Sequence, residues 1–402
     1  MRYIIKRFFK AVVIIFIIGT TNSNCKLNNQ NNKSVTKTLP IPVGKSIKST
    51  DLSCEVSNIV ILETSEESLI GAIQKIVFSD NGIHIMDRTQ DKQIISFDNH
   101  GNFISSLSKK GRGPDEYLYP MDFVFDSDSQ TLEILDNGTK SINSYGISGD
   151  FRKRTHLGFS CYSLAKNDRG SYILFLSNID KIYKNSLLNH NLLFFDDKKG
   201  LYKQIDPFPN QNILNAFSAI PYYGFSTNRN GKLLYRHYGD PIIYTVVDDA
   251  LKKEWFLDFG DQLLTEDKIT NHDFNQMKFL VDYGPKSGLV YWIQDFLELE
   301  QFVFISYAQG RKVYCNLTDI ENCKTIFQSE SFDFLNEVLK LNTISYISNF
   351  QGMLYVAIES FDFLESPLYE RLLDEDWGHI IPGLKTIKET DNPIILFYSL
   401  TK

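Results

Sequence analysis

Pairs of apolar runs, each closed by a turn rich in Asn, Asp and Gly, recur roughly every 40 to 50 residues from Ile76 onward. In the first unit, apolar runs at 76–78 and 83–86 flank Asn81-Gly82, and the next pair flanks His100-Gly101. An Asn-Gly pair readily supplies the positive φ values of a two-residue hairpin, so turn and pattern both predict antiparallel strands. A period of this length is typical of a β-propeller, in which each repeat forms one blade.

The repeat can be followed along the chain as six predicted blades. They span roughly 73–110, 118–155, 158–206, 214–260, 287–328 and 343–402. The stretch from Asp261 to about Lys286 is polar and alternates poorly, which favours a helical insertion between the fourth and fifth blades. Asn58–Leu62 is an apolar strand without a partner in its own repeat, and we expect it to close the last blade. The predicted fold is therefore all-β, a six-bladed β-propeller with an N-terminal strand closing the last blade.

The first 25 residues indicate export. Four basic residues within 2–10 precede an eight-residue apolar run at 11–18, which is too short to cross a bilayer core of about 30 Å as a helix. Cys25 and the polar run after it look like the lipid-modified start of a mature bacterial lipoprotein, although Asn22-Ser23-Asn24 differs from the usual lipobox. Simple secretion and an uncleaved N-terminal anchor are the alternatives.

These features divide the chain into three parts. We predict a lipoprotein-type signal peptide over 1–24, a flexible tether over 25–40 and the propeller domain over 41–402. The predicted location is the cell envelope, with the lipid-anchored domain facing the periplasm or exposed at the cell surface. All three interpretations of the N-terminus place the domain outside the cytoplasm.

Charge narrows the range of partners. Removing the four cations of the signal takes the formal net charge from −7 to −11. Such a surface repels nucleic acid and acidic membrane faces. We therefore expect a protein, peptide or glycan of the envelope as partner, no nucleic acid, and membrane contact only through the N-terminal lipid. The domain is expected to be a monomer.

The cysteines and carboxylates suggest few cofactors. Cys315 and Cys323 flank a predicted hairpin, so an oxidising compartment would allow a disulfide between them. No cysteine spacing matches a zinc site, the seven histidines are scattered, and no cofactor is expected. Asp126, Asp136 and Asp196 close strands at comparable points. We interpret them as caps of turns, with calcium binding at the axial channel as the alternative.

Three segments carry a family resemblance. They are Val60–Thr64 with the apolar residues up to Ile76, the motif Phe97-Asp98-x-x-Gly101-Asn102-Phe103, and Gly111–Tyr117 followed by a strand ending at Asp126. Together they resemble the six-bladed β-propeller lipoproteins of Bacteroidetes, which are relatives of the NHL and TolB-like propellers. The resemblance covers residues 55–402 and is strongest over 59–150. It implies the fold, the exported location and the number of blades, and it implies no particular reaction.

The Gly111–Tyr117 segment is the sharpest local motif. As a glycine-rich loop carrying Arg112 and Glu116, it would bind an anionic or carbohydrate ligand at the mouth of the ring. As a turn between blades, it would need its glycines and Pro114 for backbone shape and Tyr117 for packing. We favour the structural interpretation.

A second candidate ligand site combines aromatic and polar side chains. Tyr222 and Tyr223 precede a strand that ends in Arg236 and His237. Sugar and peptide sites are often built this way, although strand aromatics of a propeller also serve as packing residues. This site, like the one at Arg112, Glu116 and Tyr117, is a candidate for ligand binding.

The predicted function follows from the absence of a catalytic signature. The sequence contains no GxSxG elbow and no HExxH motif. We therefore predict a binding or scaffold module for a protein, peptide or glycan. The alternative is a propeller-type metal-dependent hydrolase or lyase, either lactonase-like or acting on polysaccharides. A structural or sensory domain without a ligand pocket is the third hypothesis.

Overall fold

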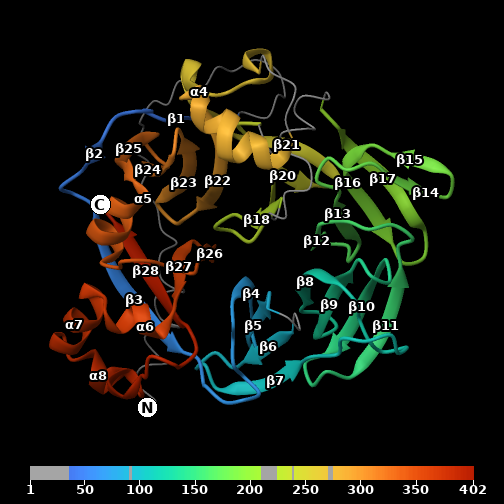
Figure 1. Cartoon of the computed structure of the whole chain (residues 1–402), viewed down its shortest axis with the longest axis horizontal. Helices are drawn as coiled ribbons and strands as arrows, with labels where there is room; N and C mark the ends of the chain where they lie inside the picture. Colours follow the sequence, from blue (N-terminus) through green and yellow to red (C-terminus); the bar gives the residue numbers. More distant parts are fainter. Residues whose placement is uncertain (1–35, 90–92, 210–223, 238–239, 270–274) are drawn as a thin grey trace, which may run out of the picture. The chain divides into compact units, whose positions relative to one another are not determined.

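Six sheets surround a central axis in the structure, a computed structural model that describes residues 36–89, 93–209, 224–237, 240–269 and 275–402 (Figure 1). Each sheet is built on four antiparallel strands that run outward from the axis in chain order, except that the last sheet takes its outermost strand from the N-terminal part of the chain. Two of the sheets gain a fifth strand at the outer edge. The six-bladed propeller predicted from the sequence is confirmed.

The strands of blades one to three follow one another along the chain. Blade one has β4 (Ile73–Ser79), β5 (Gly82–Asp87), β6 (Ile94–Phe97) and β7 (Phe103–Leu107). Blade two has β8 (Pro120–Asp126), β9 (Thr131–Asp136), β10 (Ser141–Gly146) and β11 (Phe151–His156). Blade three has β12 (Ser163–Lys166), β13 (Tyr172–Phe175), β16 (His190–Asp196) and β17 (Gly200–Pro207), with a small hairpin of β14 (Lys181–Tyr183) and β15 (Ser186–Leu188) inserted.

Blades four to six each receive an extra or final strand from the N-terminal region. Blade four has β18 (Phe225–Thr227), β19 (Leu233–Arg236), β20 (Ile242–Val247) and β21 (Ala250–Asp258), with β1 (Lys37–Pro40) at its edge. Blade five has β22 (Val290–Glu298), β23 (Phe302–Gln309), β24 (Lys312–Asp319) and β25 (Lys324–Glu330), with β2 (Ile47–Lys48) at its edge. Blade six has β26 (Tyr346–Phe350), β27 (Met353–Ile358), β28 (Ile394–Thr401) and β3 (Ser53–Ile61).

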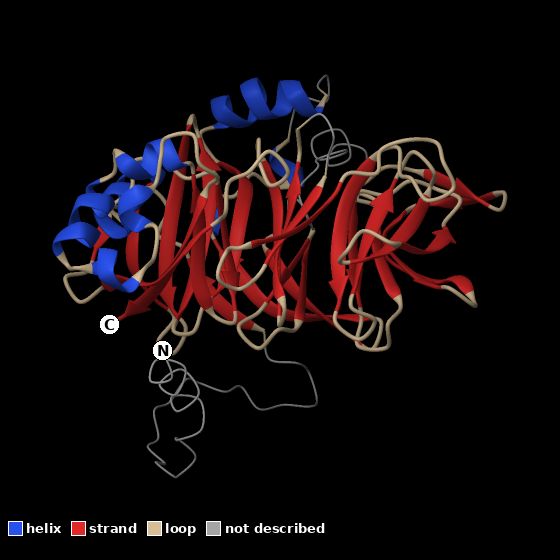
Figure 2. Cartoon of the chain, turned by 90° about the horizontal axis from the view of Figure 1, so that it is seen from below, coloured by secondary structure: helices blue, strands red, loops and turns tan. Residues whose placement is uncertain are grey.

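The helices lie in the links between strands. The link after β21 holds 3-10 turns at Gly260–Gln262 and Glu266–Lys268, then α3 (Gln276–Lys278), a π-helical turn (Phe279–Tyr283) and α4 (Gly284–Ser287). The other links hold α5 (Ser331–Asp333) with a π-helical turn (Phe334–Leu339), and α6 (Ser360–Leu364), α7 (Pro367–Asp374) and α8 (Trp377–Ile380) with a 3-10 turn (Leu384–Thr386). The helical insertion predicted between blades four and five is confirmed. Figure 2 shows the helices gathered beside and above the sheets, and none of those described is long and apolar enough to span a membrane.

Six apolar cores hold the ring together, and each is shared by two neighbouring blades. In blade one, Ile85 packs in the core shared with Tyr355 of blade six, whereas the next residue, Met86, packs in the core shared with Phe123 of blade two. Because successive side chains of a strand point to opposite faces, a middle strand with two buried faces needs apolar residues at consecutive positions. All six residues of β5 are accordingly buried.

The hairpin predicted around Asn81-Gly82 joins β4 and β5, but neither residue has the positive φ expected of it. Three other turns share one construction. Asp98, Asn167 and Asn228 each accept two backbone N–H groups within their own turn through one side-chain oxygen. Each turn also has a glycine three residues later with positive φ, as in Gly101 at 87°. A Cβ at Gly101 would lie 2.2 Å from the carbonyl oxygen of Ile61, so this turn requires glycine where blade one meets the end of β3.

Residues 37–61, the N-terminal strap, run along the outer edges of blades four, five and six. β1 pairs in parallel with β21, β2 pairs with β25, and β3 pairs antiparallel with β28 over its whole length. The closure of the last blade by an N-terminal strand is therefore confirmed. The predicted tether is too long, because residues 37–40 form β1 and Leu39 is fully buried beside Trp255 and Leu257. The free edge of β21 and this apolar core order a segment whose sequence is mostly polar.

The predicted disulfide between Cys315 and Cys323 is wrong. The structure has no disulfide between them, with Cys315 buried in β24 and Cys323 in the turn that follows. The register of the hairpin places Cys315 opposite Ser329. Because Cys323 precedes Ser329 by six residues along the chain, the two sulfur atoms are held apart by the strand pairing itself.

Replacement of Leu39 tests whether β1 belongs to the fold. Leu39→Ala should lower the free energy of unfolding by about 2–4 kcal/mol, because it opens a cavity in the core shared by blades four and five. Thr38→Ala, at an exposed position of the same strand, is the control and should have little effect. Equilibrium urea unfolding measures both. Equal stability of the two variants would mean that the strap contributes nothing at this position.

Candidate binding site in the central channel

Two cavities lie along the axis of the ring, bounded by the inner strands of the blades. The polar chamber has a volume of about 430 Å³ and lies where the inner strands begin, between residues such as Gln74, Arg236 and Asp295. The apolar chamber has a volume of about 500 Å³ and lies where the same strands end. Both volumes are in the range of small-molecule sites. The two chambers are adjacent, and together they are called the channel below; the residues that line both are Phe225, Ser226, Tyr346 and Ser348.

Three inner strands carry a β-bulge. The pairing shifts by one residue at Gln74 in β4, at Met121 in β8 and at Gln294 in β22. A bulge leaves backbone groups unpaired and turns the next side chain to a new direction. The residues that follow the three bulges are Lys75, Asp122 and Asp295, so each bulge places a charged side chain close to the channel.

In blades one to three, the charged groups satisfy one another across blade boundaries. The Nζ of Lys75 lies 2.7 Å from Oδ1 of Asp122 and also donates to the carbonyl of Phe123. Oδ2 of Asp122 accepts from the Ser163 hydroxyl and from the backbone N–H of Leu164. Asp122 is fully buried, so this arrangement is a structural tie between three blades and leaves no acceptor on that carboxylate for a ligand.

Blades four and five meet in a different arrangement. The Arg236 guanidinium donates to the carbonyls of Ile293 and Gln294, the first at 2.8 Å, and thereby pairs the oxygens that the bulge leaves free. Asp295, directly after the bulge, accepts the Ser306 hydroxyl through Oδ2. Burial raises the pKa of Asp295, while the Ser306 hydrogen bond and the Arg236 charge oppose this rise. Among the described residues, none donates to Oδ1 of Asp295, which is therefore available to a molecule in the polar chamber.

The wall of the polar chamber offers further donors and acceptors. Arg88 and Gln294 contribute nitrogen donors, and Ser226 contributes a hydroxyl group. Gln74 and Ser345 also line the wall, but the first donates to the Met121 carbonyl and the second to Glu359. Tyr346 also lines this chamber, although its hydroxyl bonds to the Ile76 backbone and to Tyr355; burial raises its pKa to about 12. It therefore stays protonated at neutral pH and can donate a hydrogen bond. The chamber has the mixture of polar groups and aromatic edges that suits a neutral, hydroxyl-rich ligand.

The Gly111–Tyr117 loop has the structural role favoured from the sequence. Tyr117 is fully buried, and its hydroxyl donates to the carbonyl of Leu107. The Glu116 carboxylate accepts the backbone N–H of Gly113 and so is used inside the loop. Arg112 is exposed and, like Glu116, does not line either chamber. The structure thus keeps these three residues apart from the channel.

Of the two described residues in the second group of predicted site residues, Arg236 lines the channel and His237 does not. His237 is buried next to Asn178 and Asn191, with its Nε2 3.1 Å from Oδ1 of Asn178. Burial lowers the pKa of His237, and carboxylates nearby oppose this shift. Tyr222, Tyr223 and Cys25 lie outside the residues that the structure describes. His237 and Arg236 therefore point to different surroundings although they are adjacent in sequence.

The three strand-ending aspartates accept backbone N–H groups of turns, as interpreted from the sequence. Asp136 binds the N–H groups of Tyr119, Leu118 and Gly138, and Asp196 binds two N–H groups of its own turn. Asp126 accepts N–H groups of its turn and also binds Lys166 of blade three. Within the described ranges, no three His, Cys, Asp or Glu side chains come together as a metal site.

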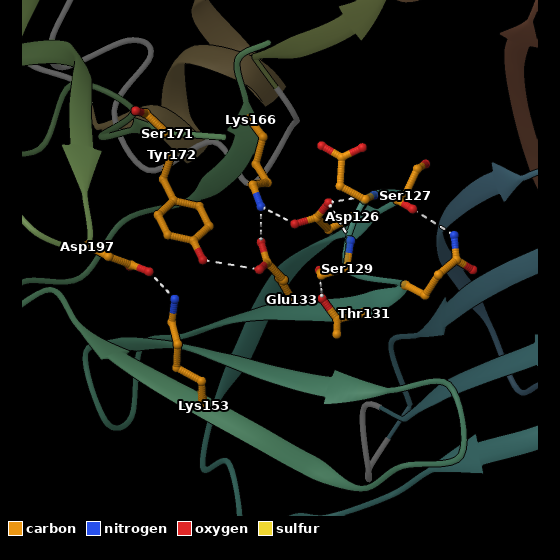
Figure 3. A network of polar contacts seen from close by, with 12 residues as sticks. Asp126, Ser127, Ser129, Thr131, Glu133, Lys153, Lys166, Ser171, Tyr172 and Asp197 are labelled. Carbon is orange, nitrogen blue, oxygen red and sulfur yellow. Dashed lines mark hydrogen bonds and ion pairs between the residues drawn. The ribbon is translucent and has the colours of Figure 1, made fainter. Parts of the chain in front are cut away.

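A polar network joins blades two and three beside the channel (Figure 3). Lys166 of β12 forms ion pairs with Asp126 and with Glu133, the latter at 3.1 Å, and the Tyr172 hydroxyl donates to Glu133. Burial raises the pKa of Glu133, and the Lys166 charge limits this rise. Farther out, Lys153 pairs with Asp197. The network neutralises the only lysine of blade three on the described wall of the apolar chamber.

A family model agrees with the extent of the fold. The model described as Domain of unknown function (DUF4934) matches residues 33–399. The chain belongs to the DUF4934 family. No curated protein matches it.

Two solved structures similar to this DUF4934 chain come from Bacteroides species. A putative exported protein from Bacteroides fragilis has a TM-score of 0.71 and 16% sequence identity, with 92% of this chain and 100% of that chain covered. A member of the DUF4221 family from Bacteroides vulgatus has a TM-score of 0.51 and 11% identity, with 88% and 100% covered. At these identities the similarity shows the fold alone.

The channel residues leave a signal in the sequence that a search for local motifs does not detect. Ile73-Gln74-Lys75, Pro120-Met121-Asp122 and Ile293-Gln294-Asp295 occupy equivalent positions at the start of three blades. In each, the middle residue forms the bulge and the third is charged. An alignment of the repeats against one another would place Asp295 in this series.

His84 offers a test of packing between blades one and two. It is buried, stacks on Phe125 and bonds through its two ring nitrogens to Ser79 and Ser96. Burial lowers the pKa of His84 to about 4. The unfolded chain takes up this proton near pH 6.5, so the stability linked to His84 is complete above pH 6.5 and is lost as the pH falls towards 4.

Between pH 7.5 and pH 5.0, this histidine should therefore reduce the free energy of unfolding by about 2 kcal/mol. Urea unfolding at the two pH values measures the loss. His84→Gln should remove most of it, whereas His100→Gln, at an exposed position, should leave it unchanged. The same pH dependence in parent and His84→Gln would contradict the proposed role of burial.

Proposed function

We propose that this DUF4934 chain is an exported, lipid-anchored envelope protein whose propeller binds a short glycan in the polar chamber. The export-type signal over 1–24 and the cysteine at position 25 support the location. The similar protein from Bacteroides fragilis is itself described as a putative exported protein, which is consistent with this proposal. We also propose a relation to the NHL and TolB-like propeller lipoproteins, based on the sequence motifs.

The observation that carries the binding proposal is the state of Asp295. Its Oδ2 is held by Ser306, while its Oδ1 has no donor among the described residues and borders a cavity of about 430 Å³. A partly buried carboxylate oxygen without a donor costs free energy, and a ligand hydroxyl would recover it. The surrounding amides and hydroxyls would orient a molecule with several hydroxyl groups. A free peptide end is the other ligand that this mixture of groups would accept.

A metal-dependent hydrolase or lyase has less support. Apart from Asp295, the carboxylates near the channel are used by backbone N–H groups, by Lys75 or by Lys166. Among the described side chains, no three of His, Cys, Asp or Glu come together to hold a metal ion. Binding rather than catalysis therefore accounts for the channel with fewer assumptions. A protein or peptide of the envelope is the alternative ligand for the polar chamber.

Calorimetric titration of the purified chain with short oligosaccharides, peptidoglycan fragments and short peptides tests the binding proposal. A glycan should bind, and Asp295→Asn should weaken it at least tenfold through loss of a charged acceptor. Asp80→Asn, at an exposed position away from both chambers, is the matched control and should bind normally. If peptides bind and glycans do not, the ligand class is wrong. If Asp295→Asn binds as well as the parent, the site is wrong.

Metabolic labelling with a fatty-acid analogue tests the anchor. Cys25→Ser should abolish incorporation into the chain and move it from the membrane fraction to the soluble fraction, because one thiol carries the whole attachment. Cys54→Ser keeps all residues of the signal and is the control. Unchanged labelling of Cys25→Ser would rule out lipidation at this residue.

A further inference from the structure

The wall of the apolar chamber carries side chains that are apolar and yet only partly buried. Their exposed parts face a cavity of about 500 Å³. Apolar surface collected on a concave wall marks a binding site, since side chains that only pack would be covered by their neighbours. Blades one, two, four and six contribute these side chains, which are Val77, Phe78, Val124, Phe125, Phe225, Leu233 and Phe350.

The two lysines of this wall do not make the chamber charged. Lys75 is paired with Asp122 at 2.7 Å, and Lys166 is paired with Asp126 and Glu133 (Figure 3). The pairs form between neighbouring strands and need no ligand to balance them. An uncharged alkyl or aryl group can therefore enter without separating an ion pair, and it gains about 25 cal/mol for each Å² of apolar surface that leaves water.

The two chambers are adjacent and share lining residues. Phe225 and Tyr346 line each of them, and Asp295 lies on the wall of the polar chamber. Apolar and polar side chains are mixed in both cavities, as Ile243 and Phe296 are with Asp295 in the polar chamber. The two cavities differ in that the lysines of the apolar wall are paired, whereas Asp295 has a carboxylate oxygen without a donor among the described residues.

We propose that the channel binds an amphiphile, with a sugar-like head against Asp295 and an alkyl or aryl tail in the apolar chamber. The position of the head rests on the proposed function, which is glycan binding in the polar chamber. The tail rests on the apolar wall alone, so the two parts can be tested separately. This inference names the ligand as a glycolipid-like molecule or alkyl glycoside rather than a free sugar.

A series of alkyl glucosides tests the tail. Methyl, hexyl and octyl β-D-glucoside share one head and differ only in chain length, and each is titrated calorimetrically into the purified chain below its micelle concentration. Binding should strengthen by up to about fourfold for each CH₂ that becomes buried. Methyl glucoside should bind most weakly, because it reaches only the polar chamber.

Variants of the apolar wall show whether the tail occupies it. The double variant Val77→Thr with Val124→Thr keeps the shape of both side chains and adds hydroxyl groups to the wall. It should weaken octyl glucoside at least tenfold and leave methyl glucoside unchanged. Val247→Thr, an exposed residue of β20 outside the channel, is the matched control. Leu233→Gln is a second wall variant, and thermal melting confirms that each variant is folded.

The outcomes distinguish the tail site from the head site. Equal affinity for all three glucosides, or no effect of either wall variant, overturns the tail site and leaves glycan binding standing. Chain-length dependence that is lost in the wall variants but unaffected by Asp295→Asn supports the tail site and contradicts the head. No binding of octyl glucoside overturns the inference as a whole.

Discussion

Burial of both faces of every blade is the constraint on which this structure depends. Each of the six apolar cores draws its residues from two neighbouring sheets, as Ile85 and Tyr355 do for blades one and six. A blade without a neighbour would expose one whole face, so no blade is stable by itself and the ring must be complete. The strap, the buried middle strands and the aromatic contacts between blades all follow from this requirement. The DUF4934 fold is therefore stabilised around a circle rather than about one centre.

The same constraint creates the channel. Inner strands have a neighbour on only one edge, so their bulged backbone and polar side chains must find partners across blade boundaries. Lys75 and Asp122 do so completely, and Arg236 supplies the donors for the bulge of blade five. Asp295 is the exception to this pairing, because one of its carboxylate oxygens has no donor among the described residues. A ligand site arises at the point where structural pairing stops.

The blades could be predicted because short sequence patterns specify them. The binding site could not, because its residues are far apart along the chain. Asp or Asn followed by glycine at a fixed spacing predicts a hairpin, so the blades can be derived from the sequence. An apolar strand such as 58–62 needs a partner strand, so the closure of the last blade can be derived as well. β1 escapes prediction because four residues with one buried side chain have no periodicity, and their order comes from the edge of β21. Asp295, Arg236 and Tyr346 lie on separate blades, and no local pattern links them. Arg112 and Glu116 stand out in the sequence, although the Glu116 carboxylate is used by a backbone N–H group of its own loop.

The strap near the start of the chain depends for its pairing on a strand near the end of the chain, which is synthesised last. Ile61 pairs with Ile394, so a growing chain carries β3 without a partner until almost its whole length has been made. Contacts so distant in sequence form slowly, and sheets with open edges are prone to associate wrongly in the meantime. A product that stops short of β28 lacks the strand that β3 needs and leaves the ring with two open sheets. Such an incomplete product would be accessible to proteases. The topology thus makes complete chains resistant and incomplete chains susceptible to degradation.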